Sequence, residues 1–300
     1  MEESLKKTFV FLKEILEGGR GVEQARKINL DEKLFRSFEE RRCKKIAAID
    51  GSSYDILDGE FFIIGGRRTG YVIADSEKIL ERKIGDIKID FLGKEKMLNK
   101  IKMPENPHEV NELLREREEH LVANEVIEKL GKNDIILMDG SLEGNEYVSH
   151  IIEENFETAR QKGIRIVGIS KKSSLIIKNV PIINMVKRKG EELFAKERWY
   201  YPLFERCYIV KFHPLSRFVF RVDINENEDA EEILGEIASL CNDVCFLGYP
   251  YPLADIHNHV VITSHDAFDI KMKLQEMAIE NGFTLEEWEA LFFDYHEYLR

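Results

Sequence analysis

The sequence has few cysteines, prolines and tryptophans and no long apolar run. Its 300 residues include four cysteines, seven prolines and two tryptophans. The cysteines are scattered, and Cys241 and Cys245 are not spaced as a CxxC motif, so we interpret them as buried thiols in a reducing compartment. No apolar stretch approaches the ~20 residues that span a bilayer, and Met1 to Lys7 leads into no apolar signal region. We therefore expect a cytoplasmic protein with no membrane partner.

Positive charge is outweighed by negative charge. The chain has 44 Lys and Arg against 56 Asp and Glu, which gives a formal net charge of −12. This balance argues against non-specific coating of nucleic acid but still permits binding in a local groove. Basic residues cluster at a few places, which we interpret mostly as solvated faces: 41–45, 67–68, 171–172 and 187–189.

The apolar runs and their breaks predict one α/β domain at 41–300 that follows a helical N-terminal arm at 1–40. A 33% share of charged residues is typical of a globular protein. The expected helices are 2–40, with a second helix at 28–38, then 107–130, 145–162, 230–240 and a final set from 253. The expected strands are 45–50, a hairpin at 60–74 that turns at Gly65 to Arg68, 79–91 with a turn near Gly85, 134–139, 164–169 and 218–222.

Two of the expected strands end in the same three residues. One apolar run leads into Asp50-Gly51-Ser52 and the other into Asp139-Gly140-Ser141. Short apolar runs are typical of strands buried on both faces, and the glycine after each aspartate lets the backbone turn sharply. Two carboxylates on core strands of one sheet can converge on a divalent cation. The sequence therefore predicts a metal site at the ends of these strands.

The helix at 107–130 supplies a third carboxylate. Leu114, Glu118 and Val122 step by four residues, so the periodicity places Glu118 toward the sheet. A carboxylate on an apolar helix face is costly unless it is paired or bound to metal. Glu116 and Glu119 fall on more polar faces and are expected in solvent. A shift in the periodicity would move the metal glutamate, so the choice among Glu116, Glu118 and Glu119 stays open.

The segment from Gly248 to His257 contains two Tyr-Pro pairs and continues into a helix with two histidines. Prolines fix the backbone, and Tyr249 is suited to bind a phosphate or stack on a base. His257 is a candidate metal ligand or proton shuttle, with His259 and Asp255 as alternatives. Trp199 to Tyr201 fits either a base-stacking platform or packed core, and we favour packed core.

The expected elements follow the order of the ribonuclease H-like (RNase H-like) fold. In this order a strand with an aspartate is followed by antiparallel strands, an acidic helix, a second strand with an aspartate, a helix and a strand. Two other functions fit parts of the pattern. Gly-Ser amides cradle phosphate, which would suit an actin-like (ASKHA) phosphotransferase, although the expected glycine-rich adenosine-binding segment is missing. The other alternative is a non-catalytic RNase H-like adaptor that has lost its metals, which the retained carboxylates argue against.

The motifs together resemble one family. The segments AIDGS at 48–52, LMDGSL at 137–142, VGISKKS at 167–173 and GYPYPLADIH at 248–257 resemble the NurA nucleases, and the resemblance spans about residues 45–265. It implies an RNase H-like mixed sheet flanked by helices. It also implies manganese-dependent cleavage of DNA, as a 5′ to 3′ exonuclease and single-strand endonuclease, with two metal ions expected and magnesium as a substitute.

The resemblance also implies residue roles and partners. Asp50, Glu118 and Asp139 are expected to bind metal, with His257 completing the site. Tyr249 is expected beside the site and Lys171 on the DNA phosphate. The expected partners are single-stranded DNA, duplex DNA ends, a second copy of the chain and a HerA-type hexameric ATPase, in DNA end resection and double-strand break repair.

Overall fold

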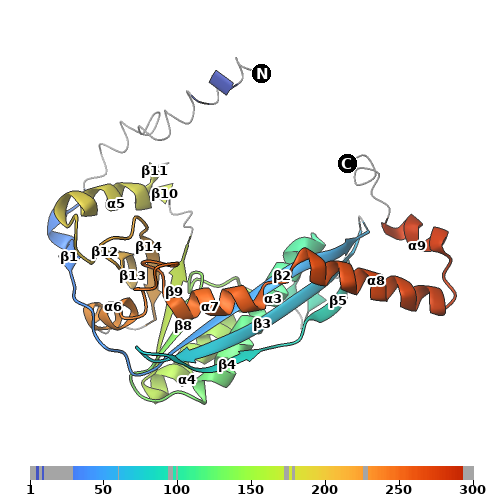
Figure 1. Cartoon of the computed structure of the whole chain (residues 1–300), viewed down its shortest axis with the longest axis horizontal. Helices are drawn as coiled ribbons and strands as arrows, with labels where there is room; N and C mark the ends of the chain where they lie inside the picture. Colours follow the sequence, from blue (N-terminus) through green and yellow to red (C-terminus); the bar gives the residue numbers. More distant parts are fainter. Residues whose placement is uncertain are drawn as a thin grey trace. The chain divides into compact units, whose positions relative to one another are not determined.

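The computed structural model describes residues 5–6, 9, 30–59, 61–93, 97–98, 101–171, 176–177, 180–225 and 229–292 (Figure 1). The chain divides into two compact units. The larger unit comprises residues 43–166 and 251–300, and the smaller unit comprises residues 1–42 and 167–250. Within the described chain, no helix combines the length and apolarity needed to cross a bilayer.

Most of the predicted N-terminal arm at 1–40 lies outside the described residues. The helix predicted at 28–38 is wrong for residues 30–38, which form a short 3₁₀ turn, η1 (Glu32–Leu34), followed by the two-residue strand β1 (Arg36–Ser37). Pairing of Arg36 and Ser37 with Tyr200 and Trp199 satisfies backbone groups that a helix would otherwise bond internally. The division into an arm and a domain at 41–300 stays a prediction.

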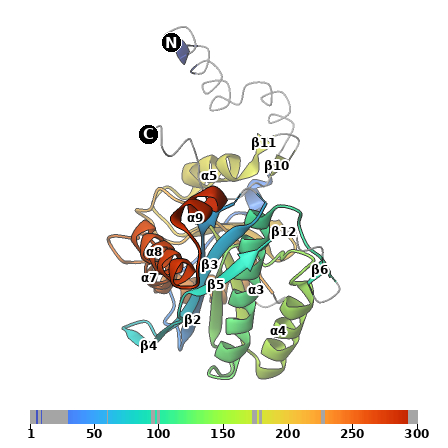
Figure 2. The same ribbon diagram turned by 90° about the vertical axis from the view of Figure 1, so that its right-hand side faces the viewer.

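The larger unit is a mixed sheet with helices on both faces. Its strand order is β8–β2–β3–β4, with β5 also paired to β3. β2 and β8 are parallel, whereas the other pairs are antiparallel. Figure 2 shows α3 and α4 on one face and α7 and α8 on the other. The strands are β2 (Ile46–Asp58), β3 (Ile63–Ala74), β4 (Ile79–Ile84), β5 (Lys88–Leu92) and β8 (Ile135–Asp139), with β6 (Met97–Leu98) and β7 (Ile101–Lys102) forming a separate pair.

The helices of this unit largely follow the predicted pattern. α3 (Pro107–Ile127) begins after Asn106, whose side chain accepts a hydrogen bond from the His108 amide at 3.1 Å. α4 (Ser149–Lys162) ends at Gly163, which takes a left-handed φ of 66°. The remaining helices are α7 (Tyr251–Val260), α8 (Ser264–Glu280) and α9 (Leu285–Phe292). α7 therefore begins two residues before the predicted start at 253.

The predicted turn at Gly65 to Arg68 is wrong. β3 runs through these residues without a break and pairs with β2 from Asp58↔Ile63 to Ile46↔Ala74. The glycines serve packing: a Cβ on Gly65 would lie 2.7 Å from the Asn111 side-chain oxygen of α3. Gly65 thus marks the close approach of a helix to this strand. The predicted turn near Gly85 is also wrong: residues 85–87 interrupt the predicted strand, but β4 and β5 both run antiparallel to β3, so the chain keeps its direction.

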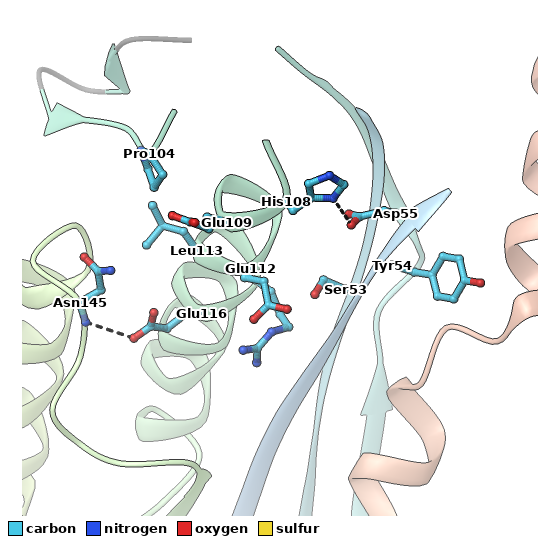
Figure 3. A pocket seen from close by; sticks show the side chains of 11 residues that line it. Ser53, Tyr54, Asp55, Pro104, His108, Glu109, Glu112, Leu113, Glu116 and Asn145 are labelled. Atoms are coloured by element: carbon cyan, nitrogen blue, oxygen red, sulfur yellow. Dashed lines mark hydrogen bonds and ion pairs between the residues drawn. The ribbon is translucent and has the colours of Figure 1, made fainter. Parts of the chain in front are cut away.

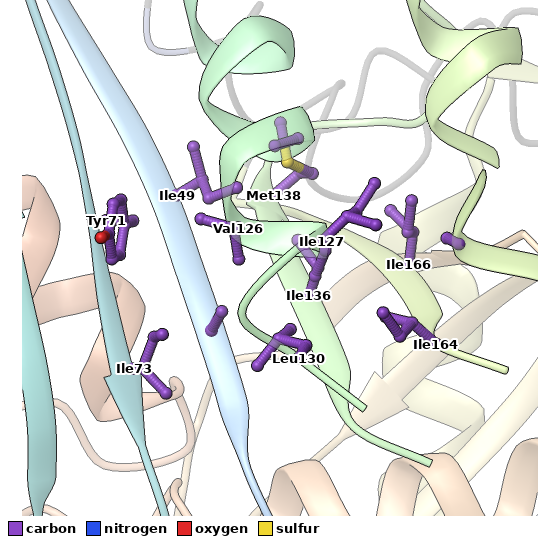
Figure 4. Close-up of a cluster of buried hydrophobic side chains, with 13 residues drawn as sticks. Ile49, Tyr71, Ile73, Val126, Ile127, Leu130, Ile136, Met138, Ile164 and Ile166 are labelled. Atoms are coloured by element: carbon purple, nitrogen blue, oxygen red, sulfur yellow. The ribbon is translucent and has the colours of Figure 1, made fainter. Parts of the chain in front are cut away.

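The core under α3 is built from alternate residues of three strands. Ala47 and Ile49 of β2 pack with Ile136 and Met138 of β8 and with Tyr71 of β3 (Figure 4). Helix α3 covers this layer with several side chains, among them Ala123, Val126 and Ile127. Because side chains alternate along a strand, the intervening residues of β2 and β8 face the other helix layer.

The smaller unit is a second layered structure with its own core. Its strand order is β1–β12–β13–β14–β9, and the register of each neighbouring pair is antiparallel. Trp199 is fully buried and its ring centroid lies 5.7 Å from that of Phe35, so the preference for packed core at Trp199 to Tyr201 is confirmed. The further elements are β9 (Arg165–Ser170, of which 167–170 belong here), β10 (Ile176–Ile177), β11 (Val180–Pro181), α5 (Ile182–Leu193), β12 (Trp199–Phe204), β13 (Cys207–Lys211), β14 (Phe220–Ile224) and α6 (Ala230–Ala238).

Candidate metal centre

Asp50 and Asp139 lie side by side on two parallel strands, Asp139 at the end of β8 and Asp50 within β2. The last register pair of β2 and β8 is Ile49↔Met138, and each aspartate is the next residue along its strand. Ile49 and Met138 point into the core under α3, so strand alternation turns both aspartates toward the face covered by α7. The two aspartates are therefore brought together as predicted.

The predicted turn after each aspartate is present only at Asp139. β8 ends there, and Gly140 has a φ of 130°, a conformation that L side chains rarely adopt. β2 instead continues from Asp50 to Asp58. Gly51 serves a close approach: a Cβ at this position would lie 2.6 Å from Glu119 Oε1.

Helix α7 brings a histidine to the aspartates. His257 Nδ1 lies 2.7 Å from Asp50 Oδ2, and one ligand atom from each of Asp50, Asp139 and His257 lies within 4.8 Å of the others. We call these three residues the metal cluster. Asp50 is buried, whereas the His257 side chain is about half exposed, so solvent reaches the cluster from the histidine side.

The charge of the metal cluster is only partly compensated within the fold. Burial raises the pKa of Asp50, and the neighbouring charge of Asp139 raises it further. Hydrogen bonds from His257 and from the Gly51 amide, the latter at 2.8 Å, act in the opposite direction. A raised carboxyl pKa means that the anionic form is disfavoured, and a bound cation would relieve this cost.

Glu119 of α3 is close enough to Asp50 and Asp139 to be affected by their charges. It is only 5% exposed, and burial is the main cause that raises its pKa to about 8. The charges of Asp50 and Asp139 raise it too, while the ion pair with Arg115 lowers it. The prediction of a solvated Glu119 is wrong, because the α3 face that meets the sheet extends one residue beyond the predicted stripe.

Glu118 lies in a different set of contacts. Its carboxylate is 3.4 Å from Arg67 Nε and 3.4 Å from Lys88 Nζ. Arg67 is 3% exposed, donates to Asn111 at 3.2 Å and forms an ion pair with Asp90. We call Arg67, Lys88, Asp90, Asn111 and Glu118 the Arg67 network. The structure thus does not bring Glu118 into the metal cluster, and its predicted metal role stays a prediction.

A pocket of about 470 Å³ lies beside this network, between β2 and α3 (Figure 3). His108 on its wall lies 2.6 Å from Asp55, and Glu116 accepts a hydrogen bond from the Asn145 amide at 3.3 Å. Glu109 and Glu112 add further negative charge to the lining. An acidic pocket is unfavourable for a phosphate backbone, so the metal cluster is the better candidate site.

The alternatives to His257 have other partners. Asp255 is buried and accepts two hydrogen bonds from Arg82 of β4, at 2.8 and 2.6 Å. His259 Nδ1 lies 2.7 Å from the Asp255 carbonyl oxygen. The Arg82–Asp255 pair thus holds α7 on the sheet, and His257 is the residue of the three that meets the aspartates.

Lys171 and Tyr249 belong to the smaller unit. The Lys171 ammonium lies 5.3 Å from the centroid of the Tyr249 ring, which also packs on Phe220 at 5.4 Å. Their predicted roles toward phosphate stay predictions. Sequence reasoning kept Glu119 as an alternative metal glutamate but missed its ion pair with Arg115, although a four-residue spacing on one helix is typical of such a pair.

A mixed sheet with two aspartates on neighbouring parallel strands and a histidine above them defines an α/β protein with a candidate metal centre. A family model described as the NurA domain matches residues 44–262. This is most of the chain, and the chain therefore belongs to the NurA family.

Solved structures agree in fold. The chain is similar to the NurA nuclease from Sulfolobus solfataricus, with 19% identity and a TM-score of 0.63 over 92% of this chain and 98% of that chain. It is also similar to a second NurA crystal structure, with 13% identity and a TM-score of 0.54 over 87% of this chain and 94% of that chain. No curated protein matches the chain. The predicted family and the predicted α/β fold, a mixed sheet flanked by helices, are confirmed.

Proposed function

We propose that this protein is a metal-dependent nuclease that cleaves DNA. The observation that carries the proposal is the metal cluster: ligand atoms of Asp50, Asp139 and His257 lie within 4.8 Å of one another in a chain of the NurA family. The aspartates come from rigid neighbouring strands, as a site for phosphodiester hydrolysis requires. The NurA protein from Sulfolobus solfataricus, which shares the fold, is a nuclease.

The ligand atoms fit a manganese ion. Carboxylate oxygens suit hard divalent cations, and neutral imidazole is a common additional ligand. Burial and then the charge of Asp139 raise the pKa of Asp50, and burial together with the charges of both aspartates raises the pKa of Glu119. A cation would offset this cost of the anionic forms. Bound divalent ions lower the pKa of water and stabilise charge on a transferring phosphoryl group.

We assign the ligands as Asp50, Asp139 and His257, with Glu119 in the role predicted for Glu118. The support for Glu119 is its position against Gly51 and its coupling to both aspartates. The clustered ligand atoms belong to Asp50, Asp139 and His257, and Glu119 would bring the donors to four, which is enough for two ions. Magnesium is the expected substitute for manganese. Lys171 and Tyr249 would hold the phosphate backbone of the DNA.

Membership of the NurA family supports the finer proposals. We infer a 5′ to 3′ exonuclease and single-strand endonuclease that acts with a HerA-type hexameric ATPase and as a homodimer, in DNA end resection and double-strand break repair. The net charge of −12 supports such a partner, because a motor that grips DNA would supply affinity that an acidic protein lacks.

The test is digestion of end-labelled DNA with manganese, magnesium or chelator in parallel. The wild type should cleave with manganese and stop with chelator, and Asp50→Asn should reduce cleavage at least about 10³-fold. Asp58→Asn, at the far end of the same strand, is the matched control and should keep activity. Cleavage by Asp50→Asn at the wild-type rate would refute the assignment.

The alternative functions give different results in the same preparation. A phosphotransferase would consume ATP without DNA, and an adaptor would neither cleave DNA nor release heat in a manganese titration. Family membership favours the nuclease over both.

A further inference from the structure

We propose that the loop His213–Phe218 of the smaller unit binds the bases of unpaired DNA, with Phe218 as the stacking surface. This inference rests on the proposed function, since it takes DNA as the substrate. The loop joins β13 to β14. It holds two strongly exposed apolar side chains, Leu215 at 77% and Phe218 at 54%.

A cation lies directly on the exposed ring. The Arg217 guanidinium carbon is 5.2 Å from the centroid of the Phe218 ring. An aromatic ring with an adjacent arginine offers a base a stacking face and its phosphate an opposite charge. An apolar protein partner would have to desolvate this guanidinium, so the pair favours nucleic acid.

The loop is held in one conformation by its own hydrogen bonds. Ser216 is buried, and its amide donates to the His213 carbonyl at 3.0 Å. The Ser216 hydroxyl accepts from the Phe218 amide at 3.1 Å, and His213 Nδ1 accepts from the Leu215 amide at 3.1 Å. A rigid loop loses little conformational entropy when it binds, which favours recognition.

The loop packs against the turn that contains Gly248 and Tyr249 in the same unit. Gly248 has a φ of 87°, and a Cβ there would lie 2.4 Å from Ser216 Oγ, so only glycine permits this contact. Gly248 precedes Tyr249, whose ring carries the Lys171 ammonium. The loop therefore adjoins the pair already proposed to contact the phosphate backbone.

The charge of the surrounding segment suits a polyanion. Residues 206–222 contain four Arg or Lys and no Asp or Glu, in a chain with a net charge of −12. Two of these cations are used inside the unit, since Lys211 pairs with Glu191 and Arg221 with Asp223. Arg217 is exposed and lies on the ring of Phe218. Trp199 to Tyr201 is the other candidate for base stacking. A base cannot stack on Trp199, because this side chain is buried in the core.

Fluorescence anisotropy of labelled oligothymidylate, with chelator to prevent cleavage, tests the proposal on the full chain. Phe218→Ala should weaken binding of the single strand about 10-fold, and Phe218→Trp should retain it. Affinity for blunt duplex should change less than about two-fold, because paired bases present no free face. Phe204→Ala is the matched control, since Phe204 is 52% exposed in the same unit, and it should bind as the wild type does.

The outcomes separate this inference from the proposed function. Unchanged single-strand affinity in Phe218→Ala, while the wild type still cleaves DNA with manganese, would overturn the loop assignment alone. A changed oligomeric state with normal DNA binding would also overturn it and assign the loop to a protein contact. Absence of both DNA binding and cleavage in the wild type would overturn the nuclease proposal as well.

Discussion

Two acidic regions of the larger unit include neighbouring glutamates of α3, Glu118 in one and Glu119 beside the other, and they differ in how far nearby cations offset their negative charge. In the Arg67 network, Glu118 and Asp90 each meet a cation of Arg67 or Lys88. In the metal cluster, Asp50 and Asp139 repel each other, and Glu119 shares their field. A buried carboxylate that the fold neutralises serves structure, whereas carboxylates that the fold leaves crowded call for a cation.

The largest expected effect is on catalysis. Asp139→Asn should lower manganese-dependent cleavage at least about 10³-fold, because it removes one of the proposed metal ligands. Asp90→Asn, which removes one carboxylate from the Arg67 network, should change the rate less than about three-fold. Rates on end-labelled DNA for both variants test the contrast, and equal losses would erase the distinction between the two regions.

The next largest effect is on stability. Arg67→Met leaves Glu118 and Asn111 without a buried donor, so the free energy of unfolding should fall by about 3–5 kcal/mol. Arg160→Met, which breaks an exposed pair with Glu157, should cost less than about 1 kcal/mol. Urea denaturation measures both, and a loss below 1 kcal/mol in Arg67→Met would show that the network is not structural.

The smallest expected effect is on the pH dependence of the stability of the metal-free protein. The pKa of Glu119 is raised by burial from 4.5 to about 8, so between these values the folded state keeps a proton that the unfolded state has released. Stability from this group therefore falls as the pH rises through that window. Glu119→Gln removes this titration. The free energy of unfolding of the variant minus that of the wild type should therefore rise by about 2 kcal/mol between pH 6 and pH 8.5.

Chelator must be present in that experiment, since a bound cation favours the carboxylate and reverses the sign. Urea curves of the two proteins at several pH values give the difference directly. A constant gap across the range would mean that Glu119 titrates at its ordinary pKa and is not crowded.

The sequence was most informative where a short-range pattern determines the structure. Apolar runs that end in Asp50 and Asp139 predicted the strands and their convergence, because two buried strands of one sheet have few arrangements. Asn106, Pro107 and Gly163 marked helix ends through local capping. These features depend on neighbours in the chain.

The wrong predictions concern positions whose structure is determined by contacts with residues distant in sequence. Gly65 and Gly66 look like a turn, but they lie in a strand because β2 continues beyond Asp50 and pairs with them. Periodicity placed Glu119 in solvent, but Glu119 is buried as Glu118 is, because it packs against Gly51 of β2. The ion-pair partners of Glu118, Arg67 and Lys88, lie on strands that are distant in sequence. The residue pattern of the helix alone does not reveal them.

The central claim is that Glu119, and not Glu118, completes a cation site with Asp50, Asp139 and His257. Calorimetric titration of manganese into the wild type, Glu119→Gln and Glu118→Gln tests it most directly. The account predicts at least about a ten-fold loss of affinity in Glu119→Gln and wild-type affinity in Glu118→Gln. Wild-type affinity in Glu119→Gln, with the loss in Glu118→Gln, would contradict it.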